Sequence, residues 1–341
     1  MKPGNSISNL RARNSNLDDL RALAIIGVVS VHVNSHFERL VPGFLHSILS
    51  LGRFGVQLFF IISGYLMASM YSNLQSGRGF LTKRIIRLYP LWILFTLHYL
   101  IVNGPHNFVS LFLGVTMMSV LLPLTYRDFS PGGWTISAEV FNYLLWPLFF
   151  RRSNRFLIIL CGILTIVSGL CGLYVWKLGL TSSNAQWVNT SAVWNTTPFF
   201  ISGVLICRLG YKFKNSKVIL RILVLAWALS QLFVGQFIPF AILGISSVFI
   251  LGVDKKIIFP RQLTKIGENT YQIYFIHWFV IGIFSRFFNL IKFKKSSMYF
   301  IYELVIIGLV TILSLGISIC LTHTYDNPAR KFLNNKLHPK P

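Results

Sequence analysis

Uncharged, apolar runs long enough to cross a lipid bilayer recur along this chain. The longest cover residues 156–176, 222–253 and 304–325, and each is near or above the ~20 residues that a membrane-spanning helix needs. Charged residues make up only 12% of the chain, whereas soluble domains carry about 25%. This pattern predicts an all-α fold, a polytopic bundle of transmembrane helices.

The net charge of +23 does not by itself indicate a nucleic-acid partner. Lysines and arginines cluster in short segments between the apolar runs, which is the pattern of the positive-inside rule. The four cysteines lie in or at the ends of apolar segments, without the spacing of a disulfide framework or a zinc site. We therefore expect a lipid bilayer as the chain's surroundings, with no nucleic acid and no metal.

The distribution of positive charge also predicts how many apolar segments cross. If residues 108–125 cross fully, most lysines and arginines fall outside; if they do not, most fall inside, as the positive-inside rule requires. We therefore predict about ten spans, one re-entrant or interfacial segment at 108–125, and both termini in the cytoplasm. Three lysines between 292 and 295 fall outside and fit poorly. The candidate segments are 17–36, 54–72, 88–103, 108–125, 134–150, 156–176, 192–207, 218–234, 236–253, 270–288 and 299–323.

This topology divides the chain into three parts. Residues 1–16 are polar and basic and lack the features of a cleavable signal peptide, so they are predicted to form a cytoplasmic tail. Residues 17–325 form the transmembrane domain, and residues 326–341 form a second cytoplasmic tail. The polar segment 177–191 is predicted to be a loop on the outer side.

The first span carries a titratable group into the membrane. Arg21 and His32 stand eleven residues apart, which is about 16 Å along a helix, and Asp18 shares their face. An imidazole this deep in an apolar span is costly unless it has a partner or a function inside the protein. His32 is therefore a candidate catalytic residue.

Glu139 is a second intramembrane candidate, in the span that Trp134 opens at the outer face. Counting inward from Trp134, Glu139 lies about 7 Å below the interface, and His32 lies at a similar depth of about 6 Å. A carboxylate beside a histidine fixes its tautomer and stabilises its protonated form, as a general base requires. The alternative is a buried polar pair that only fixes helix packing.

Two arginines open a span on the cytoplasmic side. Arg84 and Arg87 are three residues apart and share a helical face, so their guanidinium groups suit a phosphate. Ordinary membrane anchoring is the alternative, although Arg21 lies at the same cytoplasmic level.

Two further spans carry weaker signals. Ser63 and Gly64 are small residues that allow close helix packing or leave room for a ligand. His277 lies roughly 10 Å into its span from the inner face, where a hydrogen-bonded structural histidine is the alternative.

Taken together, these segments resemble the acyltransferase-3 family of integral membrane acyltransferases. Five blocks match the family's motifs in order, and Thr135 and Thr270 replace the usual serines but keep a hydroxyl. The blocks are residues 17–21 with His32; 55–66; Arg84 with Arg87 and Pro90; 134–139 with Tyr143, Trp146 and Pro147; and Thr270, Tyr271, Tyr274 and His277.

The resemblance implies transfer of an acyl group, usually acetyl from acetyl-CoA, to a hydroxyl of a surface polysaccharide, an O-antigen of lipopolysaccharide or another glycan. It implies an enzyme of the bacterial inner membrane that uses acyl-CoA as co-substrate and holds no permanent cofactor. His32 is then essential, with Glu139 as its catalytic partner, and Arg21, Arg84 and Arg87 serve the donor. The supporting residues are Asp18, Ser63, Gly64, Tyr65, Trp134, Ser137, Tyr271 and His277.

The mechanism that follows has two forms. The pantetheine arm enters between helices lined by Ser63, Gly64 and Tyr65, and His32 either deprotonates the acceptor or carries the acyl group as an acyl-imidazole. A transporter of polysaccharide or lipid-linked sugar is the main alternative, although the inverted repeats of many transporters are not evident. A membrane sensor or scaffold is a further alternative. The acceptor sugar, acyl chain length and oligomeric state are not predicted.

Overall fold

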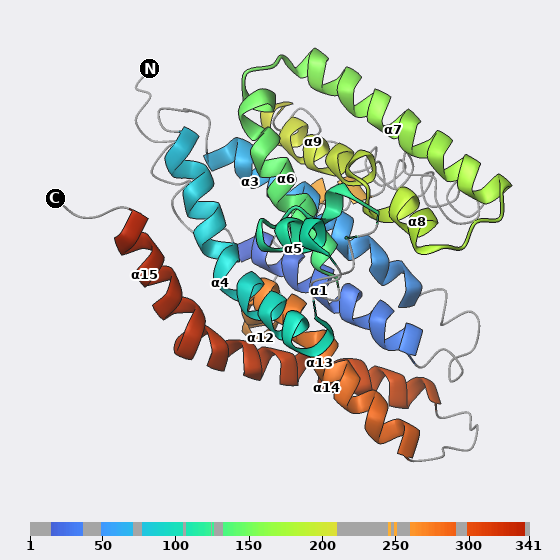
Figure 1. The fold of residues 1–341 in the computed structure, drawn as a ribbon, viewed down its shortest axis with the longest axis vertical. Helices are drawn as coiled ribbons and strands as arrows, with labels where there is room; N and C mark the ends of the chain where they lie inside the picture. Colours follow the sequence, from blue (N-terminus) through green and yellow to red (C-terminus); the bar gives the residue numbers. More distant parts are fainter. Residues whose placement is uncertain are drawn as a thin grey trace.

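The computed structural model describes residues 15–36, 49–70, 77–104, 107–123, 125, 132–209, 245–246, 249–250, 260–290 and 299–337. Every regular element within these ranges is a helix and none is a strand, which confirms the all-α prediction. The helices pack side by side as a bundle, with α7 along one edge and α14 and α15 along the opposite edge (Figure 1).

The elements follow the predicted apolar segments closely. In chain order they are α1 (Ser15–His36), η1 (Leu51–Arg53), α3 (Phe54–Met70), α4 (Gly77–Asn103), α5 (Phe108–Val115), η2 (Ser119–Leu121), α6 (Gly133–Phe150), α7 (Asn154–Lys177), α8 (Ser183–Gln186), η3 (Trp187–Ser191), α9 (Val193–Leu209), α12 (Arg261–Glu268), α13 (Thr270–Leu290), α14 (Tyr299–Leu321), η5 (Thr322–Asp326) and α15 (Asn327–Leu337).

Five helical stretches of the described chain are long and apolar enough to cross a membrane. The prediction of about ten spans is not confirmed, because segment 218–234 and most of segment 236–253 lie outside the described residues. The bundle therefore has the character of a membrane protein, while its number of spans stays a prediction. The five stretches are Leu51–Met70, Leu81–Asn103, Asn154–Lys177, Asn184–Leu209 and Ile301–Leu337.

The segment predicted not to cross, residues 108–125, is built from short pieces. Helix α5 has 8 residues, about 12 Å of rise, well short of the ~30 Å of a bilayer's hydrocarbon core. Met117 then adopts a left-handed φ of 62°, which ends the helical path. The backbone N–H of Val120 donates to Ser137 Oγ of α6 at 2.9 Å, so the buried hydroxyl of Ser137 anchors this segment to the bundle.

Small residues bring the helices of the bundle into close contact. A methyl group at Gly64 of α3 would lie 2.0 Å from the carbonyl oxygen of Phe200, and one at Gly203 of α9 would lie 2.0 Å from that of Ile61. Helices α3 and α9 therefore meet backbone to backbone, as small residues permit in membrane proteins.

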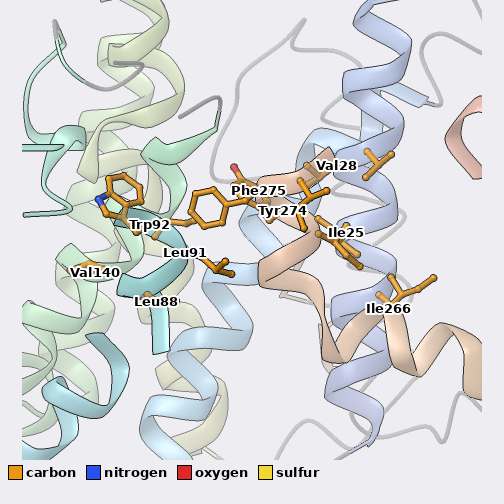
Figure 2. Packing of buried hydrophobic residues seen from close by; sticks show 14 of the residues in the cluster. Ile25, Val28, Leu88, Leu91, Trp92, Val140, Ile266, Tyr274 and Phe275 are labelled. Atoms are coloured by element: carbon orange, nitrogen blue, oxygen red, sulfur yellow. The ribbon is translucent and has the colours of Figure 1, made fainter. Parts of the chain in front are cut away.

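An aromatic and aliphatic core joins α1, α4 and α13. The rings of Phe95 and Phe275 stack with centroids 4.7 Å apart, and Trp92 meets Phe275 edge-on at 6.4 Å. Figure 2 shows Ile25 and Val28 of α1 on the other side of α13 from Trp92. This packing holds α13 between α1 and the arginine-bearing helix α4.

Two regions outside the predicted spans contain helices. The segment 177–191, predicted as a polar loop, contains α8 and the π-helix η3. Residues 327–337, in the predicted C-terminal tail, form helix α15, which follows α14 and η5. Arg330 binds Asp326 at 2.5 Å, one helical turn apart, and Asp326 is fully buried, so the helix is retained past the end of the apolar run.

Candidate active site

A cavity of about 100 Å³ lies among helices α1, α3, α4, α6, α12 and α13. The three arginines predicted to bind the donor, from two different helices, all line it. Its polar lining residues are Arg21, Ser63, Arg84, Arg87, Thr135, Glu139, Tyr143, Glu268, Thr270, Tyr271 and Tyr274. The fold therefore brings together groups as far apart in the sequence as Arg21 and Tyr274.

The arginines of the cavity differ in their contacts. Arg21 binds Asp18 at 2.7 Å, which holds its guanidinium group one turn along α1. Arg84 is buried, with its guanidinium carbon 5.7 Å from the centre of the Tyr143 ring. Arg87 keeps an exposed side chain and forms no ion pair with the described residues. The cavity therefore offers positive charge to an anionic ligand.

Glu139 is bound by hydroxyl groups inside this cavity. Ser63 Oγ donates to Glu139 Oε1 at 2.6 Å, and the Tyr143 hydroxyl donates to the same oxygen. Ser63 Oγ and the Tyr143 hydroxyl are also 2.8 Å apart. These contacts tie α3 to α6 and hold the Glu139 side chain in the lining of the cavity.

The predicted pairing of His32 with Glu139 is wrong for the described structure, in which no hydrogen bond or ion pair joins them. His32 instead contacts α13, with its ring centroid 4.2 Å from that of Trp278 and 5.4 Å from that of His277. Similar depth in the membrane did not imply contact, because rotation about each helix axis decides which side chains meet.

His277 has a defined tautomer. Its Nδ1 lies 3.1 Å from the carbonyl oxygen of Ile273, and because a carbonyl only accepts, Nδ1 carries the hydrogen. The side chain of His277 is fully buried, and its Nε2 has no hydrogen-bond partner. His277 therefore presents an unused acceptor within the ring cluster around His32.

Tyr274 separates the cavity from the histidines. It lines the cavity, and its ring centroid is 5.7 Å from that of His277. Thr135 Oγ1 donates to the Tyr274 hydroxyl at 2.6 Å, and this hydroxyl donates to the Gly132 carbonyl at 2.9 Å. Neither His32 nor His277 lines the cavity, whereas Tyr274 contacts both regions.

Most of the predicted supporting residues have a structural contact. The Tyr271 hydroxyl donates to the Leu88 carbonyl at 2.5 Å, next to Arg87. Trp134 is half-buried against an apolar cluster. Of the three residues expected to line the donor's path, only Ser63 lines the cavity. Gly64 packs on α9 and Tyr65 meets Phe249 at 5.1 Å, because successive helical residues point in different directions.

The C-terminal helices brace the arginine-bearing helix α4. The Tyr325 hydroxyl donates to the Pro90 carbonyl at 3.0 Å. Asp326, bound to Arg330, accepts from Gln272 Nε2 of α13 at 3.2 Å. The Tyr325 bond holds α4 one turn beyond Arg87, at a proline that interrupts its backbone bonding, and the Gln272 bond joins the same C-terminal segment to α13.

Sequence reasoning did not assign roles to Tyr143, Tyr274, Glu268 or Trp278. Helical spacing offered a signal for two of them, since Tyr143 is one turn from Glu139 and Tyr274 is one turn from both Tyr271 and His277. Glu268 and Trp278 carry no such signal. Within the described ranges, no group of three or more His, Cys, Asp or Glu side chains is arranged to hold a metal ion.

Comparison with known proteins agrees with this architecture. The family model described as "Acyltransferase domain" matches residues 14–323. The chain belongs to this acyltransferase family. The matched region includes every residue of the cavity and of the histidine cluster, and it ends just before Asp326.

The relatives are similar over shorter segments. "Putative peptidoglycan O-acetyltransferase YrhL" of Bacillus subtilis is 30% identical over 156 residues, 39% of this chain and 23% of that protein. "Putative O-acetyltransferase SACOL0978" of Staphylococcus aureus is 38% identical over 77 residues, 23% of this chain and 10% of that protein. "Acyltransferase MdmB" of Streptomyces mycarofaciens is 26% identical over 153 residues, 41% of this chain and 40% of that protein.

The chain thus spans well under half the length of each of these relatives. No solved structure matches the chain significantly. The family is therefore established by the extent of the family match, while activity and substrates have to be argued from the site.

Proposed function

We propose that this protein is a membrane O-acyltransferase that moves an acyl group, most simply acetyl, from cytoplasmic acyl-CoA to a hydroxyl of a glycan. The observation that carries the proposal is the convergence of Arg21, Arg84 and Arg87 on one cavity, whose lining residue Tyr274 contacts His277. Family membership and the names of the relatives support the reaction class.

The arginines suit the anionic part of the donor. Guanidinium groups bind phosphate oxygens through charge-assisted, often bidentate hydrogen bonds, and Arg87 is available because no acidic side chain of the described chain pairs with it. The cavity of about 100 Å³ is small beside the roughly 300–1,000 Å³ of a typical ligand pocket. We therefore assign it to the narrow thioester arm, with the phosphates at the arginine side.

His32 supplies the acid–base chemistry in this proposal. The acceptor's hydroxyl oxygen attacks the thioester carbonyl carbon, the new carbon–oxygen bond forms, and the carbon–sulfur bond breaks. The hydroxyl proton passes to His32 and then to the departing CoA thiolate, so that atoms and charge balance. In the relay form, a ring nitrogen of His32 attacks the thioester carbonyl carbon, the carbon–sulfur bond breaks and CoA leaves as the thiol with the imidazole proton. The acceptor hydroxyl then attacks the acyl-imidazole, the carbon–nitrogen bond breaks and the hydroxyl proton returns to the imidazole.

Either form requires a movement in the described structure. His32 does not line the cavity, and in this proposal the acyl group passes the Tyr274 side chain to reach it. The Tyr274 hydroxyl is held by Thr135 and Gly132, and breaking two hydrogen bonds costs about 1–3 kcal/mol in total. This is small beside the binding energy of a charged donor, so donor binding can drive the movement.

The remaining assignments complete the proposal. The distribution of lysines and arginines favours both termini in the cytoplasm. In that topology the three arginines lie on the cytoplasmic side, where acyl-CoA is found. A bacterial inner membrane gives access to both the donor and the glycan. A surface polysaccharide or O-antigen is the acceptor class we favour. A transporter of lipid-linked sugar would explain the buried charges but would show no dependence on acetyl-CoA.

The decisive test compares surface glycans from cells with and without the gene. We expect mass spectrometry to show loss of one acyl mass per acylated unit in the deletion strain, restored by the wild-type gene and not by the His32→Ala variant. Unchanged acylation in the deletion strain, or normal acylation with His32→Ala, contradicts the proposal.

A further inference from the structure

Three aromatic rings form a cluster beside the donor cavity. His32 of α1 meets Trp278 and His277 of α13 at 4.2 Å and 5.4 Å between centroids, and His277 and Trp278 are 5.6 Å apart. Each of the two α13 residues therefore lies close enough to His32 to contact a substrate bound there.

Two polar atoms of this cluster are buried without a partner. His277 Nε2 is an acceptor, because the hydrogen of the ring is committed to the Ile273 carbonyl. Trp278 Nε1 carries a hydrogen and is a donor, and it too is buried and unbonded. Leaving such groups unsatisfied costs about 1–3 kcal/mol each, so a polar ligand that satisfies both would recover that cost.

The backbone of Gly132 lies close beside the indole nitrogen. Gly132 has a left-handed φ of 75°, and a methyl group there would lie 3.3 Å from Trp278 Nε1 and 2.7 Å from the Tyr274 hydroxyl. Both the backbone conformation and the close approach therefore require glycine at the entrance to α6.

We propose that His277 Nε2 and Trp278 Nε1 form the subsite that holds the acceptor's hydroxyl groups at His32. The ligand is a polyhydroxyl compound with neighbouring hydroxyls, one accepting from the indole N–H and one donating to the imidazole nitrogen. This inference rests on the proposed function and adds to it the residues that select the acceptor. Binding also brings the hydroxyl oxygen to His32 without involving the arginine cavity.

The test measures acceptor and donor dependence separately. The full chain in detergent is supplied with acetyl-CoA labelled in the acetyl group, and an envelope extract of the deletion strain is the acceptor source. Trp278→Phe keeps the ring and removes the donor, so we expect about tenfold more extract to be needed for half-maximal labelling of alkali-labile esters, the effect of about one hydrogen bond. The half-saturating acetyl-CoA concentration stays unchanged.

Matched variants separate hydrogen bonding from general damage. His277→Phe keeps a ring but removes the acceptor and should act like Trp278→Phe, whereas His277→Gln restores an acceptor and should recover part of the effect. Trp176→Phe, at a side chain that is 77% exposed on α7, and His323→Phe, at an exposed position of η5, should change nothing.

The outcomes distinguish this inference from the proposed function. If the wild-type protein transfers no label from acetyl-CoA, both fail. If it transfers label but Trp278→Phe leaves the extract requirement unchanged, or alters only the acetyl-CoA dependence, the acceptor subsite is wrong and the proposed reaction stands. If the Trp278→Phe protein does not fold, the His277→Phe protein decides. A normally folded His277→Phe protein with an unchanged extract requirement also overturns the subsite.

Discussion

The arginine cavity and the histidine cluster both include side chains of helix α13. They differ in whether their buried polar groups have hydrogen-bond partners. In the cavity, Glu139 accepts from two hydroxyls and Arg21 is paired with Asp18. In the cluster, His277 Nε2 and Trp278 Nε1 are buried and unbonded.

This difference concerns how each region is prepared for a ligand. A network of satisfied bonds fixes the geometry of charged groups before a charged ligand arrives. Buried polar atoms without partners are costly in the free protein and gain most when a ligand supplies hydrogen bonds. We interpret the cavity as pre-organised for the donor and the cluster as completed by the acceptor.

The largest expected effect comes from removing the imidazole of His32. His32→Ala should lower acyl transfer by about 10²–10⁴-fold, the usual contribution of a general acid–base group, while acetyl-CoA binding is retained because His32 does not line the cavity. Transfer is measured by labelled ester formation and binding by equilibrium dialysis. His98→Ala, at an exposed histidine of α4, is the control. Loss of acetyl-CoA binding in His32→Ala would erase the distinction between the two regions.

The complementary change removes the charge of the cavity. Arg84→Ala combined with Arg87→Ala should raise the half-saturating acetyl-CoA concentration about 10²–10⁴-fold, since hydrogen bonds to charged groups contribute about 1.5–3 kcal/mol each. Arg155→Ala, at an exposed arginine of α7, should not. An unchanged acetyl-CoA requirement in the double variant would show that the cavity does not hold the donor.

The framework that supports both regions depends on close helix packing. Gly64→Val forces a side chain into the Phe200 backbone and should lower stability by about 1–3 kcal/mol or more, as overpacking does. Gly162→Val, where nothing lies within 4 Å, is the matched change. Thermal unfolding in detergent compares them, and equal melting temperatures would mean that α3 and α9 do not meet as described.

A smaller effect is expected at the residue between the regions. Tyr274→Phe keeps the ring but removes the hydrogen bonds to Thr135 and Gly132, so it should cost about 1 kcal/mol of stability. By loosening the barrier it should also raise acetyl-CoA hydrolysis in the absence of acceptor. Release of free CoA measures this, with Tyr174→Phe on exposed α7 as the control. Hydrolysis at the wild-type rate would indicate that Tyr274 does not separate the two regions.

Sequence reasoning was most successful along single helices. The Asp18–Arg21 contact and the shared cavity of Arg84 and Arg87 follow from three-residue spacing on one helix, which the helical period alone dictates. It failed where two helices had to be matched. Glu139 and His32 lie at a similar predicted depth, but Ser63 and Tyr143 bind the carboxylate, and α13 supplies the neighbours of the imidazole.

The amino-acid sequence alone determined that the chain forms apolar helices and which acyltransferase motifs it carries. It also determined which residues share a face of each helix, because that depends only on the local period of 3.6 residues. Only the tertiary structure decided that Tyr274 stands between arginines and histidines and that Trp278 lies against His32. Those contacts depend on the rotation and approach of whole helices, which are set by backbone contacts such as those at Gly64 and Gly203.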